Sequence, residues 1–117
     1  MQYFKLSEFD SPDLPGSGSR MKPEFLTMID RARDIAGVPF VINSGFRTVA
    51  HNTEVGTVNS SHLTGCAADI AVRNSAQRFR IMAALVAVGF TRIGIGATFL
   101  HCDNDTTKTP GVAWLYA

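Results

Sequence analysis

The sequence predicts an α+β fold, in which a small antiparallel sheet packs against two main helices. Two segments carry apolar residues at helical spacing, one in residues 23–36 and one in residues 75–88. Several shorter runs are rich in β-branched and aromatic residues and end at turn-forming residues, which is typical of strands. With 117 residues, of which 45% are hydrophobic and 18% charged, the chain is expected to form one domain, residues 1–117.

Residues 1–20 are expected to form a surface loop. The stretch from Ser11 to Ser19 is made of turn formers that continue neither a helix nor a strand. We expect Phe4, Leu6 and Phe9 to pack this loop onto the domain.

The first helix is predicted to begin at Pro23, which suits a first helical turn, and to stop at Gly37. The second helix is capped by Asn74 or Ser75 and closes at Gly89. The predicted apolar faces consist of Phe25, Met28, Ile29, Ala32, Ile35 and Ala36 in the first helix and Phe79, Met82, Leu85 and Val86 in the second.

The first predicted strand, residues 40–43, is expected to be buried and to lead into a loop that carries Arg47. Residues 49–61 are polar and without period, so we expect a long loop, and such loops in compact domains are often functional. In the next strand, residues 67–72, alternation puts Asp69 on the face opposite the core.

The second helix is followed by residues 91–96 and 98–103, two short apolar runs separated by one residue, which indicates a hairpin. A turn region, residues 104–111, then leads into a last strand, residues 112–116.

The composition excludes several classes of function. A formal net charge of +1 argues against nucleic acid or an anionic membrane surface as a partner. No apolar run approaches the roughly 18 residues that span a bilayer, and the N-terminus lacks the pattern of a secretory signal. We therefore expect synthesis in the cytoplasm without membrane insertion. Cys66 and Cys102 are expected to be buried thiols, with a bridge between neighbouring strands as the alternative.

Potential metal ligands occur in two places along the chain. His62 precedes Asp69 by seven residues, and Gly65 lies between them where the chain can bend. In the later strand, alternation puts His101 and Asp103 on one face. Two histidines and one carboxylate form the three-ligand set of a catalytic zinc site, which leaves a fourth position for water. A metal would also compensate a carboxylate in an apolar strand.

A zinc site of this kind is equipped to hydrolyse an amide, because it lowers the pKa of bound water and polarises a carbonyl. A neighbouring carboxylate must then accept the water proton. We expect Asp103 to be this base, with Glu54 and Asp105 as reserves. Arg47, at the end of a buried strand, is suited to bind a substrate carboxylate or to stabilise an oxyanion.

Each of these residues also has a simpler interpretation. A lone His62 or His101 is more often a hydrogen-bonded histidine, and a lone Arg47 would pair with Asp69 or Asp103. It is their combination that favours a site. By the same reasoning, we expect His51 only to form hydrogen bonds within its loop. Trp114 and Tyr116 are expected either to cover the sheet or to line a groove.

The motifs together resemble a known family, the zinc D-alanyl-D-alanine carboxypeptidases, whose relatives include D-Ala-D-Ala dipeptidases and phage L-alanyl-D-glutamate endopeptidases. The resemblance extends from Phe9 to Trp114 and is most specific in the SxHxxGxAxD pattern. The segments that carry it are Ser44–Thr48, His51-Asn52, Val55-Gly56, Ser60–Ile70 and His101–Asp103.

This resemblance implies a hedgehog-like fold, Zn²⁺ on His62, Asp69 and His101, and peptidoglycan stem peptides as substrates. It implies that Arg47 contacts the substrate, and we expect Ser44, Ser60 and Trp114 to contribute to substrate binding. One position departs from the family pattern, because many members have a catalytic glutamate where this chain has Thr98. A branch with an HxD ending resembles the chain better and again points to Asp103.

The function expected from the sequence is therefore that of a zinc peptidase, acting as a D-Ala-D-Ala carboxypeptidase or endopeptidase on cell-wall peptides. A monomer of endolysin type, from a phage or prophage, would reach the wall after release from the cytoplasm. The alternative, suggested by Thr98, is a catalytically silent zinc domain that binds wall fragments or a protein partner.

Overall fold

A five-stranded sheet forms the centre of the computed structural model, which describes residues 1–56 and 59–116. The strand order is β1-β2-β4-β3-β5, and the strands are β1 (Ile42–Ser44), β2 (Ala67–Ala71), β3 (Arg92–Ile95), β4 (Phe99–Asp103) and β5 (Val112–Leu115). All neighbouring pairs are antiparallel except β3 and β5, which are parallel. The α+β class is confirmed, although the sheet is mostly rather than wholly antiparallel.

The parallel pair follows from where β4 ends. Asp103, the last residue of β4, lies opposite Arg92, the first residue of β3. The chain crosses this end of the sheet through residues 104–111 and enters β5 at Val112, which pairs with Arg92. Strand β5 must then run in the same direction as β3.

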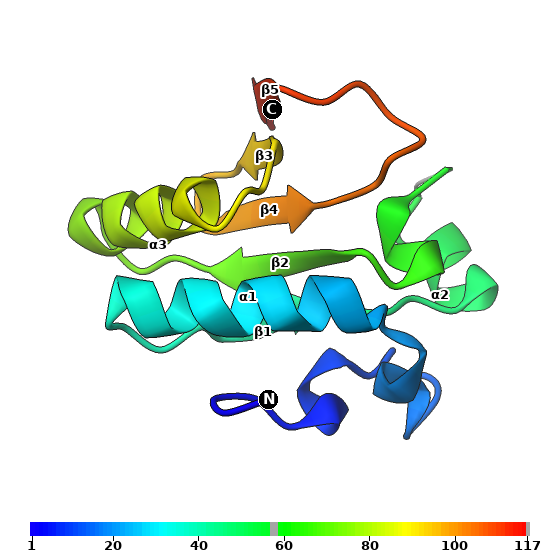
Figure 1. Cartoon of the computed structure of the whole chain (residues 1–117). Coiled ribbons are helices and arrows are strands. Elements are labelled where there is room, and N and C mark those ends of the chain that lie inside the picture. Colours follow the sequence, from blue (N-terminus) through cyan, green and yellow to red (C-terminus); the bar gives the residue numbers. More distant parts are fainter. Residues whose placement is uncertain (57–58, 117) are drawn as a thin grey trace.

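Helices α1 (Pro23–Ala36) and α3 (Ser75–Ala87) pack against each other and cover one face of the sheet (Figure 1). Their predicted boundaries are confirmed: Pro23 occupies the first turn, and the Asn74 side chain accepts a hydrogen bond of 2.8 Å from the Gln77 amide. Gly37 ends α1 with a φ of 67°, in the left-handed region that favours glycine.

The predicted apolar faces are correct at their centres and wrong at their margins. Phe25, Ile29, Ala32 and Leu85 are buried. Ile35, Phe79 and Val86, by contrast, are exposed by 52%, 73% and 60%. The buried side of α3 is centred on Ile81, Ala84 and Leu85, because these residues face α1 and the sheet.

The N-terminal segment is more ordered than the predicted surface loop. It forms two 3-10 helices, η1 (Leu6–Phe9) and η2 (Ser17–Arg20). Phe4 and Phe9 belong to the core, whereas Leu6 is 45% exposed. The segment lies under the loop of Arg47, since the Phe46 amide donates to the Phe9 carbonyl at 2.9 Å. It therefore supports the site as well as the core.

Two other predictions about the first half of the chain need correction. Strand β1 begins at Ile42 rather than residue 40, and Val41 is 48% exposed because β1 is an edge strand. The predicted loop 49–61 contains helix α2 (Val49–Glu54) and leads into a third 3-10 helix, η3 (Ser61–Thr64). Residues 57 and 58 of that prediction lie outside the described residues.

The two faces of the central strands carry different side chains. Ala68, Ile70, Leu100 and Cys102 are buried on the face that packs against the helices. Asp69, His101 and Asp103 alternate with them and lie on the opposite face. Cys66 and Cys102 are both buried and free. Within residues 1–56 and 59–116, no helix has the length and apolar character needed to cross a membrane.

Candidate metal centre

The register of β2 against β4 brings two predicted ligands together. Asp69 pairs with His101 directly across the two strands, and side chains in such a pair lie on the same face. The Oδ1 atom of Asp69 and the Nδ1 atom of His101 are 2.9 Å apart. Alternation within each strand and the observed register together bring these two side chains to one face.

The third ligand comes from η3, which precedes β2. The Ser60 hydroxyl caps this short helix by accepting a hydrogen bond of 3.2 Å from the His62 amide. Gly65 then turns the chain into β2 with a φ of 73°, and a Cβ atom here would lie 2.4 Å from the Arg20 carbonyl oxygen. This turn places His62 Nε2 at 3.4 Å from Asp69 Oδ1.

The three side chains form a group that fits a metal ion. Their ligand atoms all lie within 4.8 Å of one another, and His62 and His101 are buried. Two ligands at about 2.0–2.1 Å from a tetrahedral zinc ion are roughly 3.3–3.4 Å apart. The separation of His62 Nε2 from Asp69 Oδ1, 3.4 Å, agrees with that geometry.

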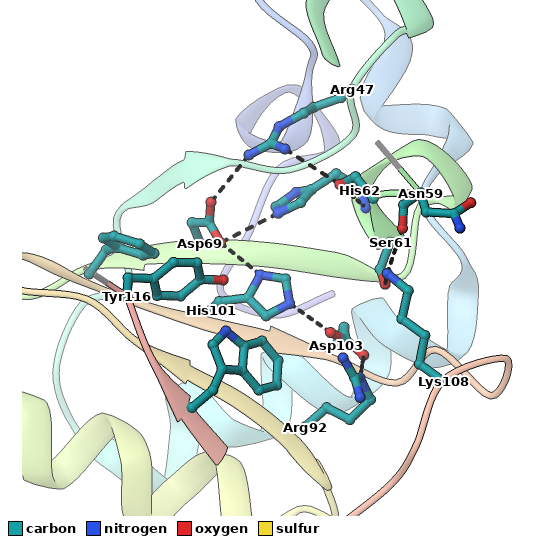
Figure 2. A pocket seen from close by; sticks show the side chains of 13 residues that line it. Arg47, Asn59, Ser61, His62, Asp69, Arg92, His101, Asp103, Lys108 and Tyr116 are labelled. Carbon is teal, nitrogen blue, oxygen red and sulfur yellow. Dashed lines mark hydrogen bonds and ion pairs between the residues drawn. The ribbon is translucent and has the colours of Figure 1, made fainter. Parts of the chain in front are cut away.

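Hydrogen bonds behind the two imidazoles fix which nitrogen of each ring faces the centre. His62 Nδ1 donates to the Gly45 carbonyl at 2.8 Å, which leaves Nε2 directed at Asp69. His101 Nε2 lies 2.6 Å from Asp103 Oδ2, which leaves Nδ1 directed at Asp69. Such partners set the tautomer and orientation of metal-binding histidines. The arrangement is therefore prepared for a cation (Figure 2).

The electrostatics of the centre are consistent with a compensated buried charge. Burial raises the pKa of Asp69, but hydrogen bonds with His101 and His62 outweigh it and hold the pKa well below its usual range. Burial lowers the pKa of His101, but hydrogen bonds to Asp103 and Asp69 outweigh this effect and raise it. Both carboxylates therefore favour the protonated form of His101.

Asp103 lies on the far side of the His101 ring from the metal-binding group. Its side chain is 1% exposed, and its Oδ1 atom accepts hydrogen bonds of 2.9 Å from Arg92 Nε and 3.2 Å from the Asp105 amide. Its Oδ2 atom is engaged by His101. This geometry favours orientation of His101 as the role of Asp103, whereas its assignment as general base stays a prediction.

Arg47 lies beside Asp69 at the edge of the site. Its Nε donates to Ser44 Oγ at 3.0 Å, and its two terminal nitrogens lie 3.4 Å from Ser60 Oγ and 3.5 Å from Asp69 Oδ2. A further contact of 3.4 Å joins Arg47 to the buried Asn52 of α2. The pairing with Asp69 agrees with the simpler interpretation of Arg47, and the position in the cleft leaves its predicted substrate role open to test.

The metal-binding group lies in a cleft of about 300 Å³. Three cationic side chains line it, from Arg47, Arg92 and Lys108 (Figure 2). Three aromatic residues also line it, Phe99, Trp114 and Tyr116. Trp114 packs against His101 with ring centroids 5.5 Å apart, and the Arg92 guanidinium lies 5.0 Å from the Trp114 ring. The cleft therefore combines cationic groups with aromatic rings beside the metal-binding group.

The structure brings most of the predicted site residues to this cleft. The residues that line it include Arg47, Ser60, His62, Asp69, His101, Asp103 and Trp114. Ser44 contacts Arg47 from behind and, in the described part of the chain, does not line the cleft. Glu54 and Asp105, the predicted reserves for the general base, do not line the cleft either. Glu54 pairs with His51, and Asp105 accepts a hydrogen bond from Ser61.

Sequence reasoning assigned no role to several residues that line the cleft, among them Arg92 and Lys108. Arg92 could have been found, because the hairpin register pairs it with Asp103. Tyr116, for which the sequence left a place in a groove open, lines the cleft with Trp114; the two are two residues apart, so alternation places both on one face. Lys108, whose Nζ atom donates to the Asn59 carbonyl at 2.6 Å and to Ser61 Oγ at 2.9 Å, sits in a turn region without any pattern that marks it.

Comparison with protein families agrees with this geometry. A family model described as Peptidase M15 matches residues 2–103, which include the three candidate metal ligands and Arg47. The matched segment ends at Asp103 and thus excludes β5. Among curated proteins, no match is found.

Proposed function

The chain belongs to the peptidase M15 family, and from this premise we propose that it is a zinc-dependent peptidase of peptidoglycan stem peptides or cross-links. M15 peptidases act on peptidoglycan peptides. Within that range, a D-Ala-D-Ala carboxypeptidase and an endopeptidase of endolysin type are both consistent with the cleft. The expectation of cytoplasmic synthesis followed by action on the wall stays a prediction.

The observation that carries the proposal is the buried group of His62, Asp69 and His101, with both rings already oriented by hydrogen bonds. Zinc bound to this group would supply a Lewis acid and a water molecule of lowered pKa. The protein's own contribution is to keep the three donors converged. Gly45 holds His62 through its carbonyl oxygen, and Asp103 holds His101.

The remaining residues of the cleft suggest how a peptide is bound. Arg47 is positioned to pair with a carboxylate of the substrate, and the Ser60 hydroxyl beside it is a further polar contact. Ser44 supports this function by holding the Arg47 guanidinium rather than by direct contact. Trp114 offers an apolar wall for the side of the peptide next to His101. These roles remain proposals.

Hydrolysis of purified peptidoglycan tests the proposed function. We expect release of new amino groups by the zinc-loaded protein, loss of release with a chelator, and recovery when zinc is restored. His62→Ala should abolish both zinc binding and release. His51→Ala is the matched control, because His51 belongs to α2 and pairs with the exposed Glu54 outside the cleft. Zinc-independent release, or equal loss in both variants, would contradict the proposal.

The carboxylates of the cleft support a second candidate function, which is binding of wall fragments without hydrolysis. Among the described residues that line the cleft, the carboxylates are those of Asp69 and Asp103, and both are already engaged by histidines. Thr98, at the position of the family's catalytic glutamate, does not line it. A zinc-bearing domain that binds wall fragments without cleaving them would retain these fragments in a pull-down while releasing no amino groups.

A further inference from the structure

The last strand supplies a wall of the cleft that the family match does not include. Strand β5 pairs with β3, and the pairing continues past its end, because the Tyr116 amide donates to the Ile95 carbonyl at 3.0 Å. Trp114 and Tyr116 therefore project from the same face of the sheet as His101. Both line the cleft, although they lie beyond residues 2–103.

The ring of Tyr116 is held by its neighbours. Its centroid lies 5.0 Å from that of Phe99 and 6.3 Å from that of Trp114. Gly94 leaves space for both rings, since a Cβ atom there would lie 2.5 Å from Tyr116 Cε2 and 2.8 Å from the Trp114 indole. In this position the hydroxyl group of Tyr116 points toward Asp69 and His101 (Figure 2).

The other cationic donors of the cleft have partners in the protein or, in the case of Arg47, a role already proposed for the carboxylate of the substrate. Arg92 donates to Asp103 and to the Thr109 carbonyl, and Lys108 donates to Asn59 and Ser61. Arg47 lies beside the other oxygen of Asp69. A phenol with a usual pKa of about 10 keeps its proton at neutral pH and acts as a hydrogen-bond donor.

We propose that Tyr116 is a catalytic residue, whose hydroxyl donates a hydrogen bond to the carbonyl oxygen of the scissile peptide as that oxygen becomes an oxyanion. This inference rests on the proposed peptidase function. A donor aimed at the developing charge stabilises the transition state more than the bound substrate. The energetic effect of Tyr116 should therefore appear in kcat rather than in KM.

Tyr116→Phe tests the inference, because it removes only the hydroxyl and keeps the ring against Phe99 and Trp114. Loss of one oxyanion donor typically costs about 100-fold or more in kcat. We expect this decrease with an unchanged KM, unchanged zinc affinity and unchanged thermal stability. The affinity of the zinc-loaded protein for a phosphinate dipeptide, which mimics the tetrahedral intermediate, should fall by a similar factor. Tyr3→Phe is the matched control, since Tyr3 hydrogen-bonds Asp34 away from the cleft.

The possible results separate this inference from the proposed function. If Tyr116→Phe cleaves wall peptides and binds the phosphinate like the wild type, the inference is wrong and the peptidase function stands. If Tyr116→Phe loses zinc affinity, the hydroxyl acts on the metal site and the inference is also wrong. If the wild-type protein neither cleaves wall peptides nor binds the phosphinate, both proposals fail together.

Discussion

The two faces of the β2–β4 pair share one backbone but are stabilised in opposite ways. Toward the helices, Ile70 and Leu100 are fully buried among apolar side chains, and their burial stabilises the fold without specific partners. Toward the cleft, Asp69, His101 and Asp103 carry ionisable side chains that are poorly exposed, so each requires a partner. The helix-covered face thus provides the stability that keeps the polar face in place.

Removing apolar volume from the helix-covered face should have the largest effect on the fold. We expect Leu100→Ala to lower the free energy of unfolding by about 2–5 kcal/mol, because Leu100 is fully buried. Chemical denaturation measures this change. The protein that remains folded should still bind one zinc ion, since Leu100 faces away from the metal-binding group. If the Leu100→Ala protein had wild-type stability, the claim that the helix-covered face stabilises the fold would be wrong.

On the polar face, Asp103→Asn distinguishes a positioning role from that of a general base. If Asp103 orients His101, zinc affinity should fall by about 10–100-fold, as is typical when such a partner is lost. If it is the base, zinc affinity should stay the same while kcat falls by roughly 100–10,000-fold. Competition with a chromophoric chelator measures the affinity. The geometry predicts the loss of zinc affinity. Unchanged zinc affinity with a lower kcat would instead support Asp103 as the general base.

A change at Arg92, the other side-chain partner of Asp103, refines this test. Arg92→Gln removes the guanidinium that holds Asp103 Oδ1 but leaves His101 and Asp103 in place. A smaller loss of zinc affinity than in Asp103→Asn is expected, since the carboxylate still reaches His101 Nε2.

A smaller effect is expected at the edge of the cleft. Arg47→Lys keeps the charge but loses the planar guanidinium that reaches Ser44, Ser60 and Asp69 together. We expect KM for wall peptides to rise about tenfold, the value of one hydrogen bond to a charged group. Steady-state kinetics on a defined stem peptide measure this change. Unchanged kinetics would assign Arg47 to structure alone.

The smallest effect concerns pH in the metal-free protein. The pKa of His101 is raised, so its contribution to stability is present below about pH 6.5 and is lost as the pH rises through the raised value. The pKa values of Asp69 and Asp103 are lowered, so their contributions are present above about pH 4 and lost in stronger acid. We expect the Tm with chelator to be highest between these limits and to fall by a few degrees toward pH 9.

Zinc should reverse the alkaline part of that trend, because metal binding displaces the proton from His101 Nδ1. A Tm of the metal-free protein that rises steadily from pH 6 to pH 9 would contradict the two-carboxylate environment of His101.

The same comparison explains what the sequence could predict. The helix-covered face follows from periodicity and from local signals such as Pro23, Gly37 and Asn74, which act within a few residues. The candidate metal ligands follow from residue types and from a glycine-containing motif. What could not be predicted depends on contacts distant along the chain. The direction of β5, the two 3-10 helices of the N-terminal segment, and the position of Lys108 are of this kind.

Asp103 shows where local sequence patterns stop being sufficient and contacts in the folded structure are needed. Alternation correctly places it on the face of His101. It cannot say which side of the imidazole ring the carboxylate contacts, and that choice decides between base and positioning residue. Phe79 and Val86 show a related limit. The apolar face of α3 is wider than the surface that packs against it, so these two side chains at its margins stay exposed.

The most direct test of the metal centre is the X-ray absorption spectrum of the zinc-loaded protein. We predict about four nitrogen or oxygen ligands near 2.0–2.1 Å, with the outer-shell scattering of two imidazoles and no sulfur. Sulfur at about 2.3 Å, which would implicate Cys66 or Cys102, or a spectrum without imidazole scattering, would contradict convergence of His62, Asp69 and His101 on one ion.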